Sequence, residues 1–248
     1  MRKIIVGDTH GCYKELVSLM RKVKLDRKND TICFLGDYTD RGPESYKTTK
    51  YLQKMKKEMG DRCVLILGNH EQFVIDYVEN HADDLWFING GRTTFESFKK
   101  GVEKRTIWEN RFKEYVSFLK ESTSLFYDLG ECYLAHASFL NEDPEYTAKS
   151  DPDHFVWDRT MLEYGLYNGK LGVVGHTPLA NPTLSIGEDC GLGMKMPIFK
   201  TYEIGKMYDL PKKGLLCIDT CCFGTGHLTA LVIENGKMKF YQTEKREE

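Results

Sequence analysis

Three short turns in the first third of the chain carry residue types that commonly bind metal ions. The turns read Gly7-Asp8-Thr9-His10-Gly11, Gly36-Asp37-Tyr38-Thr39-Asp40-Arg41-Gly42 and Gly68-Asn69-His70-Glu71, and each follows a short apolar run. Carboxylate, imidazole and amide groups without a thiolate favour manganese, iron or zinc over copper(I) or an iron-sulfur cluster. The turns therefore predict a metal centre to which Asp8, His10, Asp37 and Asn69 contribute.

Two later histidines follow apolar runs in the same manner. His136 comes after 132–135, and His176 comes after 172–174 and a glycine. Six ligands exceed what one tetrahedral ion needs, so two metals about 3.5 to 4 Å apart are the economical solution. Asp37, in the middle turn, is the natural bridging carboxylate.

A pair of divalent cations has a definite chemical use. Together they lower the pKa of a shared water enough to give hydroxide at neutral pH, and they neutralise phosphoryl oxygens during in-line attack. The sequence therefore predicts hydrolysis of a phosphate ester by direct attack of metal-bound hydroxide, without a covalent nucleophile on the protein.

Four further side chains have types suited to phosphate chemistry. The planar guanidinium of Arg41 can grip two phosphate oxygens at once, and Arg159 could supply a second clamp. His70 is free to protonate the leaving alkoxide as a general acid, because its neighbour Asn69 is the expected ligand. Asp40 could hydrogen-bond His70 and raise its basicity.

Each of these features has an ordinary structural explanation when taken alone. Glycine and aspartate are common in turns, and a single histidine is more often a satisfied structural residue than a ligand. Five turns of this kind at successive strand ends would require five coincidences. We interpret Trp86 and Trp157 as packing residues and Arg92 as a solvated surface residue.

The elements that must position these turns follow from hydrophobic spacing. Residues 3–80 repeat a unit of strand, polar turn and helix, with strands expected at 4–6, 32–35 and 64–67. Such alternation predicts βαβ units in a largely parallel sheet, with strands covered on both faces. Ligands bind beyond the carboxyl ends of such strands, where the three turns would converge.

The rest of the chain has a different pattern. A helical insert is expected at about 83–121, bordering the site, followed by strands at 125–129, 132–135, 172–174, 215–218 and 228–233. Asn235-Gly236 between two apolar runs predicts an antiparallel hairpin over 228–242. Residues 180–213, rich in glycine, proline and methionine, are expected to form a long loop with at most one short strand.

Composition limits the classes of protein. A chain of 248 residues can form one domain spanning 1–248, and 35 basic against 37 acidic residues give no attraction to nucleic acid or to an anionic membrane. No apolar stretch approaches the roughly 18 residues that span a bilayer, so we expect a cytoplasmic protein. The eight cysteines, including the adjacent Cys221 and Cys222, contain no spaced pair suited to zinc, and we expect reduced thiols.

Taken together, the three turns resemble the motifs of the PPP superfamily of metallophosphoesterases, which has the calcineurin-like fold. The resemblance extends through His136-Ala137-Ser138, Trp157-Asp158-Arg159, Gly175-His176-Thr177 and Ile218-Asp219-Thr220, and it is greatest to compact bacterial and phage-type serine/threonine phosphatases. The segment from Trp86 to Gly91 resembles an element that borders the site in bacterial members. Ala137 and Ser138 depart from the glycine pair that often follows the first of these histidines.

The resemblance carries expectations for fold and site. It implies a four-layer α/β/β/α sandwich with mixed sheets. It implies one metal held by Asp8, His10 and Asp37, and a second held by Asp37, Asn69, His136 and His176. It also implies that Arg41, Asn69 and Arg159 bind the phosphate and that Asp40 and His70 form a dyad.

Three functions remain as hypotheses. The first is a phosphomonoesterase with two divalent metals, manganese foremost, acting on phosphoserine, phosphothreonine or phosphotyrosine in a protein or on a small phosphoester. The second is a dinucleoside polyphosphate hydrolase. The third is an inert phosphate-binding module, and the complete ligand set argues against it. Oligomeric state has no sequence signal.

Overall fold

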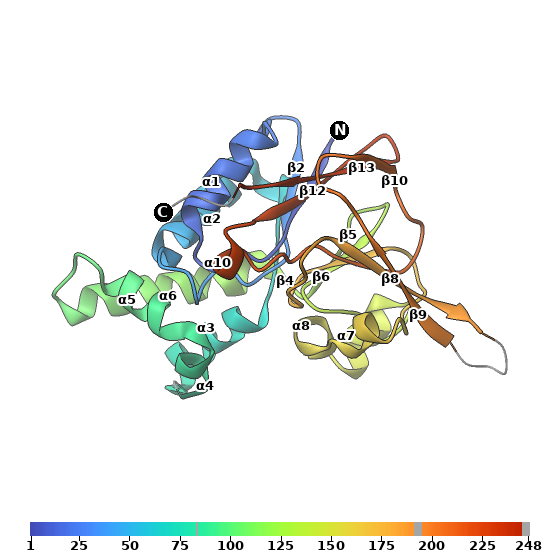
Figure 1. Ribbon diagram of the computed structural model, residues 1–248. Coiled ribbons are helices and arrows are strands. Elements are labelled where there is room, and N and C mark those ends of the chain that lie inside the picture. Colours follow the sequence, from blue (N-terminus) through green and yellow to red (C-terminus); the bar gives the residue numbers. More distant parts are fainter. Residues whose placement is uncertain (83, 191–194, 245–248) are drawn as a thin grey trace.

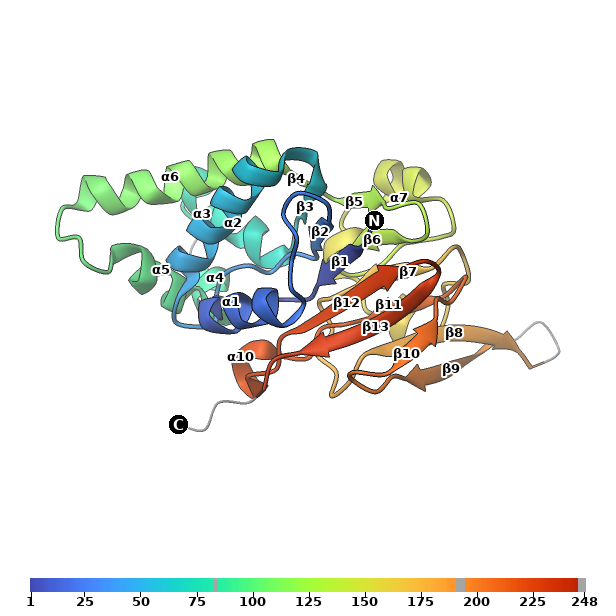
Figure 2. The same ribbon diagram turned by 90° about the horizontal axis from the view of Figure 1, so that it is seen from above.

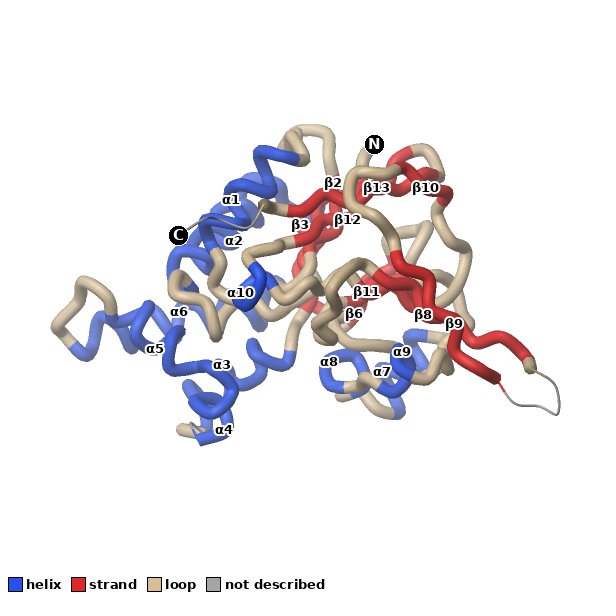
Figure 3. Tube along the Cα trace, viewed as in Figure 1, coloured by secondary structure: helices blue, strands red, loops and turns tan. Residues whose placement is uncertain are grey.

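Two β-sheets lie face to face between two layers of helices (Figure 1). The computed structural model describes residues 1–82, 84–190 and 195–244. Figure 3 shows the strands together in the middle of the molecule, with helices on the outer sides. The predicted four-layer α/β/β/α sandwich with mixed sheets is confirmed.

The first sheet contains the strands that carry the three metal-type turns. Its order is β10-β13-β12-β1-β2-β3-β4. The bounds are β1 Lys3–Val6, β2 Thr31–Phe34, β3 Cys63–Ile66, β4 Thr123–Ser124, β10 Met207–Asp209, β12 Thr229–Glu234 and β13 Lys237–Gln242. Strands β1 to β4 are mutually parallel, while β12 pairs with β1 in the antiparallel sense. The predicted parallel first half is therefore confirmed.

The second sheet carries the two later histidines. Its order is β5-β6-β7-β11-β8-β9. The bounds are β5 Phe126–Asp128, β6 Tyr133–Ala135, β7 Gly172–Val174, β8 Thr183–Asp189, β9 Lys195–Thr201 and β11 Leu215–Cys217. Strands β6, β7 and β11 run parallel to one another. The carboxyl ends of these three parallel strands therefore lie at the same edge of this sheet.

Helices form the two outer layers. On the first sheet lie α1 Tyr13–Lys22, α2 Ser45–Met59, α3 Asn69–Asn80, α5 Arg92–Lys99 and α6 Arg105–Ser122, with the short segments α4 Asp84–Trp86, η1 Gly60–Arg62 and η2 Phe87–Gly91. On the second lie α7 Pro144–Ser150, α8 His154–Trp157 and α9 Thr160–Glu163; α10 Cys222–Thr225 precedes β12. Helices thus occupy the region where the insert was expected.

Alternation along β1 explains why this sheet is covered on both faces. Ile4 and Val6 pack into the core beneath the helices, whereas Ile5 packs into the core between the two sheets. Successive side chains of a strand point to opposite faces, so apolar residues at every position require two covered faces. All three side chains are fully buried.

The prediction of a long loop over 180–213 was wrong. Strands β8 and β9 form an antiparallel pair that runs from Thr183 opposite Thr201 to Asp189 opposite Lys195, and β10 pairs with β13. Residues 191–194 of the expected loop lie outside the described residues. Pairing of β8 with β11 and of β10 with β13 places parts of this polar, glycine-containing segment in the sheets, and pairing between distant segments leaves no local pattern.

The terminal hairpin was predicted correctly. Strands β12 and β13 pair from Thr229 opposite Gln242 to Glu234 opposite Lys237. Asn235 and Gly236 have φ of 51° and 71°, the left-handed pair that a two-residue hairpin turn requires. Figure 2 shows this hairpin running along β1.

Two properties of the whole chain also bear on function. The following cysteines are free thiols, and most of them are buried: Cys12, Cys33, Cys63, Cys132, Cys217, Cys221 and Cys222. Among the described residues, no helix is long and apolar enough to cross a membrane.

Candidate metal centre

The five predicted turns come together where the two sheets meet. Loops after β1, β2 and β3 contribute from the first sheet, and loops after β6 and β7 contribute from the second. Two groups of side chains have ligand atoms within 4.8 Å of one another: His10, Asp37 and His70 in one, and Asp37, His136 and His176 in the other. All of these residues are buried.

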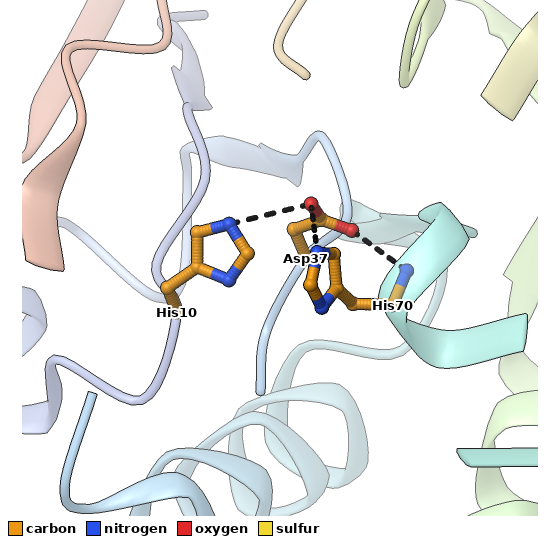
Figure 4. Close-up of side chains that lie close together, drawn as sticks. All are labelled: His10, Asp37 and His70. Carbon is orange, nitrogen blue, oxygen red and sulfur yellow. Dashed lines mark hydrogen bonds and ion pairs between the residues drawn. The ribbon is translucent and has the colours of Figure 1, made fainter. Parts of the chain in front are cut away.

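Asp37 belongs to both groups. Its Oδ2 lies 3.4 Å from Nε2 of His10 and 3.9 Å from Nε2 of His70, and Figure 4 shows both rings turned toward this carboxylate. Its Oδ1 lies 3.4 Å from Nε2 of His136 and accepts the backbone N–H of His70 at 3.1 Å. One carboxylate thus faces ligand atoms on two sides.

Asn69 completes the second group. Its Oδ1 lies 3.0 Å from Nε2 of His136 and 3.1 Å from Nδ1 of His176, and these two nitrogens are 3.1 Å apart. Asp8 lies beside them, because its carboxylate accepts the backbone N–H of His176 at 3.0 Å. The structure therefore brings together all six residues that the sequence nominated as ligands.

Hydrogen bonds behind two of the histidines fix which nitrogen faces the centre. Nδ1 of His10 lies 2.8 Å from the carbonyl oxygen of Thr39, and Nδ1 of His136 lies 2.7 Å from that of Leu35. A carbonyl only accepts, so each Nδ1 carries a proton and Nε2 is the nitrogen that faces the cluster. This is the tautomer that a metal ligand requires.

The donor set fits divalent cations. Nε2 of His136 lies 3.0 Å from the oxygen of Asn69, and Nε2 of His176 is a buried atom that has no hydrogen-bond partner among the described residues. Two glycines leave room beside the carboxylates of the cluster. A Cβ on Gly175 would lie 2.0 Å from Asp8 Oδ1, and a Cβ on Gly68 would lie 2.3 Å from Asp37 Oδ1, so a side chain at either position would collide with a carboxylate. Buried acceptors that face one another call for positive charge between them.

The pKa shifts of acidic and histidine side chains in the cluster also indicate that it needs added positive charge. Burial raises the pKa of the Asp8 carboxyl well above its usual value, and the nearby charges of Asp219 and Asp37 raise it further. Burial lowers the pKa of His136, but Asp37 and Asp8 outweigh this effect and raise it to about 10. The protein alone therefore gathers more negative charge than it can neutralise, except by binding protons or metal cations.

One pair of histidines is held neutral. Burial lowers the pKa of His10 to about 3 and that of His176 to about 3, and the charge of His136 adds to the effect on His176. The neutral imidazole is the form that ligates metals.

His70 is oriented by a short chain of hydrogen bonds. Its Nδ1 lies 2.7 Å from Oδ2 of Asp40, and the indole N–H of Trp86 donates to the same carboxylate at 2.9 Å. Burial lowers the pKa of His70, but Asp37 and Asp40 reverse the effect and raise it overall. The predicted contact between Asp40 and His70 is present, and Nε2 of His70 faces the cluster.

Two arginines flank the centre on different sides. Nη1 of Arg41 lies 2.5 Å from Nε2 of His10, and Nη2 of Arg159 donates to the carbonyl oxygen of His176 at 3.4 Å. Both residues are exposed. Each guanidinium can therefore meet an anion that arrives from solvent.

Backbone strain is concentrated at these residues. Positive φ values occur at His10 (40°), Asp37 (50°), Asp40 (69°), Arg41 (64°) and His176 (63°). Such conformations cost energy for residues other than glycine, and they cluster at functional sites. The sequence alone showed ordinary turns at these positions.

Two buried acids at the centre were not nominated from the sequence. Glu71 accepts the backbone N–H groups of Asp37 at 2.6 Å and Tyr38 at 2.9 Å, and so holds the strained turn in place. Asp219 lies close enough to Asp8 to raise its pKa, and the backbone N–H of Cys221 donates to it at 2.8 Å. Both acids lie within segments already quoted, and their position next to nominated ligands was the available signal.

The interpretation of the two tryptophans as packing residues needs correction. Trp86 is fully buried, yet its indole also supports Asp40. Trp157 is 42% exposed, donates to Gln72 at 2.9 Å, and lies 6.4 Å from His176 between ring centroids. Arg92 is exposed as expected, with its guanidinium over the ring of Phe87.

Comparison with known proteins places this centre in a family context. The family model described as calcineurin-like phosphoesterase matches residues 1–189. The chain is 27% identical to serine/threonine-protein phosphatase 2 of Salmonella typhimurium, over 64% of this chain and 68% of that protein. It is 29% identical to the asymmetrical bis(5'-nucleosyl)-tetraphosphatase PrpE of Bacillus subtilis, over 81% and 91%.

A solved structure agrees in fold. The metallophosphoesterase from Sphaerobacter thermophilus superposes with a TM-score of 0.63 at 18% identity, covering 99% of this chain and 89% of that one. Identity at this level supports the shared architecture alone.

Proposed function

The chain belongs to the calcineurin-like phosphoesterase family, and on that basis we propose that it hydrolyses phosphate monoesters of phosphoserine and phosphothreonine, and also of phosphotyrosine. The substrate would be a phosphorylated protein or a small phosphoester. We further propose two divalent metal ions per chain, with manganese before iron or zinc, because oxygen and imidazole donors suit all three. The free, mostly buried thiols favour a cytoplasmic location.

One observation carries the proposal: the carboxylate of Asp37 is shared by two groups of buried ligand-type side chains. Asp8, His10 and Asp37 would hold one cation, and Asp37, Asn69, His136 and His176 the other. When bound, a cation pair lowers the pKa of a shared water and neutralises phosphoryl oxygens.

The flanking residues would bind and orient the substrate. Arg41, beside His10, and Arg159, beside His176, approach from different sides and can each donate to phosphoryl oxygens. The amide of Asn69 would add a further hydrogen bond.

His70 would deliver the proton that the leaving oxygen needs. Asp40 accepts from Nδ1 and favours the protonated ring, while Nε2 points into the centre where an alkoxide would depart. Asp40 therefore acts through His70 and orients it.

Hydrolysis of p-nitrophenyl phosphate tests the proposal. Chelator-stripped protein should release p-nitrophenolate only after a divalent metal is added, with Mn²⁺ the most effective of Mn²⁺, Zn²⁺ and Fe²⁺. The Asp37→Asn variant should lose at least about 10²-fold in metal-dependent kcat/KM, because one carboxylate serves both groups. Asp76→Asn, an exposed substitution on α3, is the matched control. Turnover that is indifferent to metal, or to Asp37→Asn, would reject the two-metal proposal.

A second candidate function is hydrolysis of dinucleoside polyphosphates. Its support is the similarity to the Bacillus subtilis tetraphosphatase, which extends over 91% of that protein. Chromatography of products from diadenosine tetraphosphate, run beside a phosphothreonine peptide, separates the two functions. If p-nitrophenyl phosphate and both of these substrates all resist hydrolysis with each of the three metals, the third hypothesis, an inert phosphate-binding module, is favoured.

A further inference from the structure

A cavity of about 470 Å³ adjoins the metal centre on the far side of Phe223. The ring of Phe223 lies 5.5 Å from that of His10 between centroids, and the guanidinium carbon of Arg41 lies 5.1 Å from its centre. Phe223 also lines the cavity, together with Gly11 and Pro43, the residues that follow His10 and Gly42. The cavity therefore begins at the wall of the metal centre.

The cavity lies where four parts of the chain meet. Its residues come from the start of α1, the start of α2, the end of α5 and the turn around α10, and Figures 1 and 2 both show α10 beside α1. A substrate bound at the metal centre could extend along this surface without displacing a secondary-structure element.

The charges of this cavity favour an anionic ligand. Lys14 and Lys100 line it and are exposed, and among the residues that the structure describes neither ammonium group has a hydrogen-bond or ion-pair partner. Two acidic residues also line the cavity: Glu44, whose carboxylate lies 2.6 Å from the ammonium group of Lys47, and the half-buried Glu15. Arg41 adds a further positive charge at the end nearest the metals. Lys14, Lys100, Lys47 and Arg41 outnumber these two acids, and this excess of positive charge attracts negative groups from solvent.

The surface is longer than a single phosphate requires. A second cavity of about 180 Å³ shares Pro43, Glu44 and Lys100 with the first and continues past Lys47 to Ser97. The two cavities adjoin at these shared residues and are together called the lysine groove, which extends from Phe223 along the start of α2. An extended peptide occupies such a channel more fully than one compact anion does.

We propose that the lysine groove binds acidic side chains next to the phosphorylated residue of a protein substrate, so that Lys14 and Lys100 select acidic phosphopeptides. The inference rests on the phosphomonoesterase function proposed above and assigns a sequence preference to it. Electrostatic complementarity of this kind mainly affects selectivity and encounter rate.

Paired peptides test the inference. One phosphothreonine peptide carries three aspartates on each side of the phosphorylated residue, and its partner carries asparagines at the same positions, which keeps shape and removes charge. The wild-type protein with Mn²⁺ should show a kcat/KM about threefold to tenfold higher for the acidic peptide, the range expected for two exposed ion pairs. The ratio should fall toward one as ionic strength rises.

Variants assign the preference to the groove. The Lys14→Ala/Lys100→Ala variant should hydrolyse the two peptides with nearly equal kcat/KM, and Lys14→Glu/Lys100→Glu should favour the asparagine peptide. A Lys28→Ala/Lys50→Ala variant removes two exposed lysines outside the groove and should keep the wild-type ratio.

Three outcomes would overturn the inference. The first is equal kcat/KM for both peptides with wild-type protein, while both are hydrolysed, which leaves the proposed function intact. The second concerns the Lys14→Ala/Lys100→Ala variant. A preference for the acidic peptide that survives in this variant would not come from the groove, and a loss of kcat/KM confined to diadenosine tetraphosphate would assign the groove to polyphosphates. The third is hydrolysis of neither peptide: if p-nitrophenyl phosphate is still hydrolysed, only the inference fails, and if it is not, the proposed function fails as well.

Discussion

The surroundings of His70 are compatible with two chemical roles, that of a general acid and that of a metal ligand. Asp40 behind the ring suits a general acid, whereas the 3.9 Å separation between Nε2 and Asp37 Oδ2 also places His70 within a group of ligand-type atoms. A general acid and a ligand have different kinetic consequences. An acid matters most for a poor leaving group, while a ligand matters for every substrate.

We therefore predict a substrate-dependent effect for His70→Asn. The variant should keep its metal content, measured by elemental analysis of the purified protein. It should lose about 10²-fold or more in kcat for phenyl phosphate, the typical contribution of general acid catalysis. The loss for p-nitrophenyl phosphate should be much smaller, because p-nitrophenolate leaves without a proton.

The control for this prediction is His81→Asn. His81 has a φ of 56°, a conformation that asparagine tolerates well, and it lies at the end of α3. If His70→Asn instead loses metal and slows both substrates equally, His70 is a ligand rather than an acid.

At the scale of elements, the helical insert braces the strained turn that bears Asp40 and Arg41. The indole of Trp86 donates to the Asp40 carboxylate, the hydroxyl of Thr94 accepts the backbone N–H of Asp40 at 2.7 Å, and the carbonyl of Gly90 accepts that of Arg41 at 3.2 Å. The insert therefore fixes the backbone of the turn rather than contacting the ligands.

Replacement of Trp86 by phenylalanine tests this role. The variant retains aromatic packing against Tyr77 and Phe112 but removes the N–H that Asp40 accepts. We expect a loss of about 1 to 3 kcal/mol in the free energy of unfolding, the cost of a buried acceptor with one donor fewer. We also expect kcat for phenyl phosphate to fall as His70 loses its fixed orientation.

Urea unfolding and steady-state kinetics measure the two effects. Trp108→Phe is the matched control, since Trp108 packs against Phe95 and Phe112 without a hydrogen bond to another described residue. Equal behaviour of the two variants would mean that Trp86 serves only to fill space, as the sequence analysis assumed.

At the scale of the whole molecule, the metal centre joins the two sheets. Asp8, His10, Asp37 and Asn69 follow strands of the first sheet, while His136 and His176 follow strands of the second. Without cations, three buried carboxylates face one another across this junction, since Asp219 and Asp37 both act on Asp8. Ligands that bind only the folded state stabilise it in proportion to the logarithm of their concentration.

Removal of metal should therefore lower thermal stability. At a metal concentration about 100 times the dissociation constant, binding contributes about 2.7 kcal/mol. For a chain of this size that corresponds to a fall in Tm of about 5 to 10 °C on addition of a chelator. Differential scanning calorimetry measures it, and the Asp37→Asn variant should show little change. An unchanged Tm in the wild type would mean that the folded protein does not depend on bound metal.

Local sequence patterns predicted much of the fold. Strand runs bounded by glycine, helical spacing between them and the Asn235-Gly236 turn identified the parallel half and the terminal hairpin, because each depends on neighbours within a few residues. The β8 and β9 pair was missed because this segment has no clear hydrophobic period, and β8 joins the sheet through β11, which lies about 30 residues further along the chain.

The sequence by itself determined the set of residues available for metal chemistry, because ligand chemistry follows residue type and strand ends place turns at one edge of a sheet. Only the tertiary structure decided how they meet: that Asp37 faces two groups, that Trp86 and Glu71 fix the strained turn, and that Lys14 and Lys100 border one cavity beside Phe223. These relations depend on contacts between segments distant in the chain, and distance in space leaves no trace in local spacing.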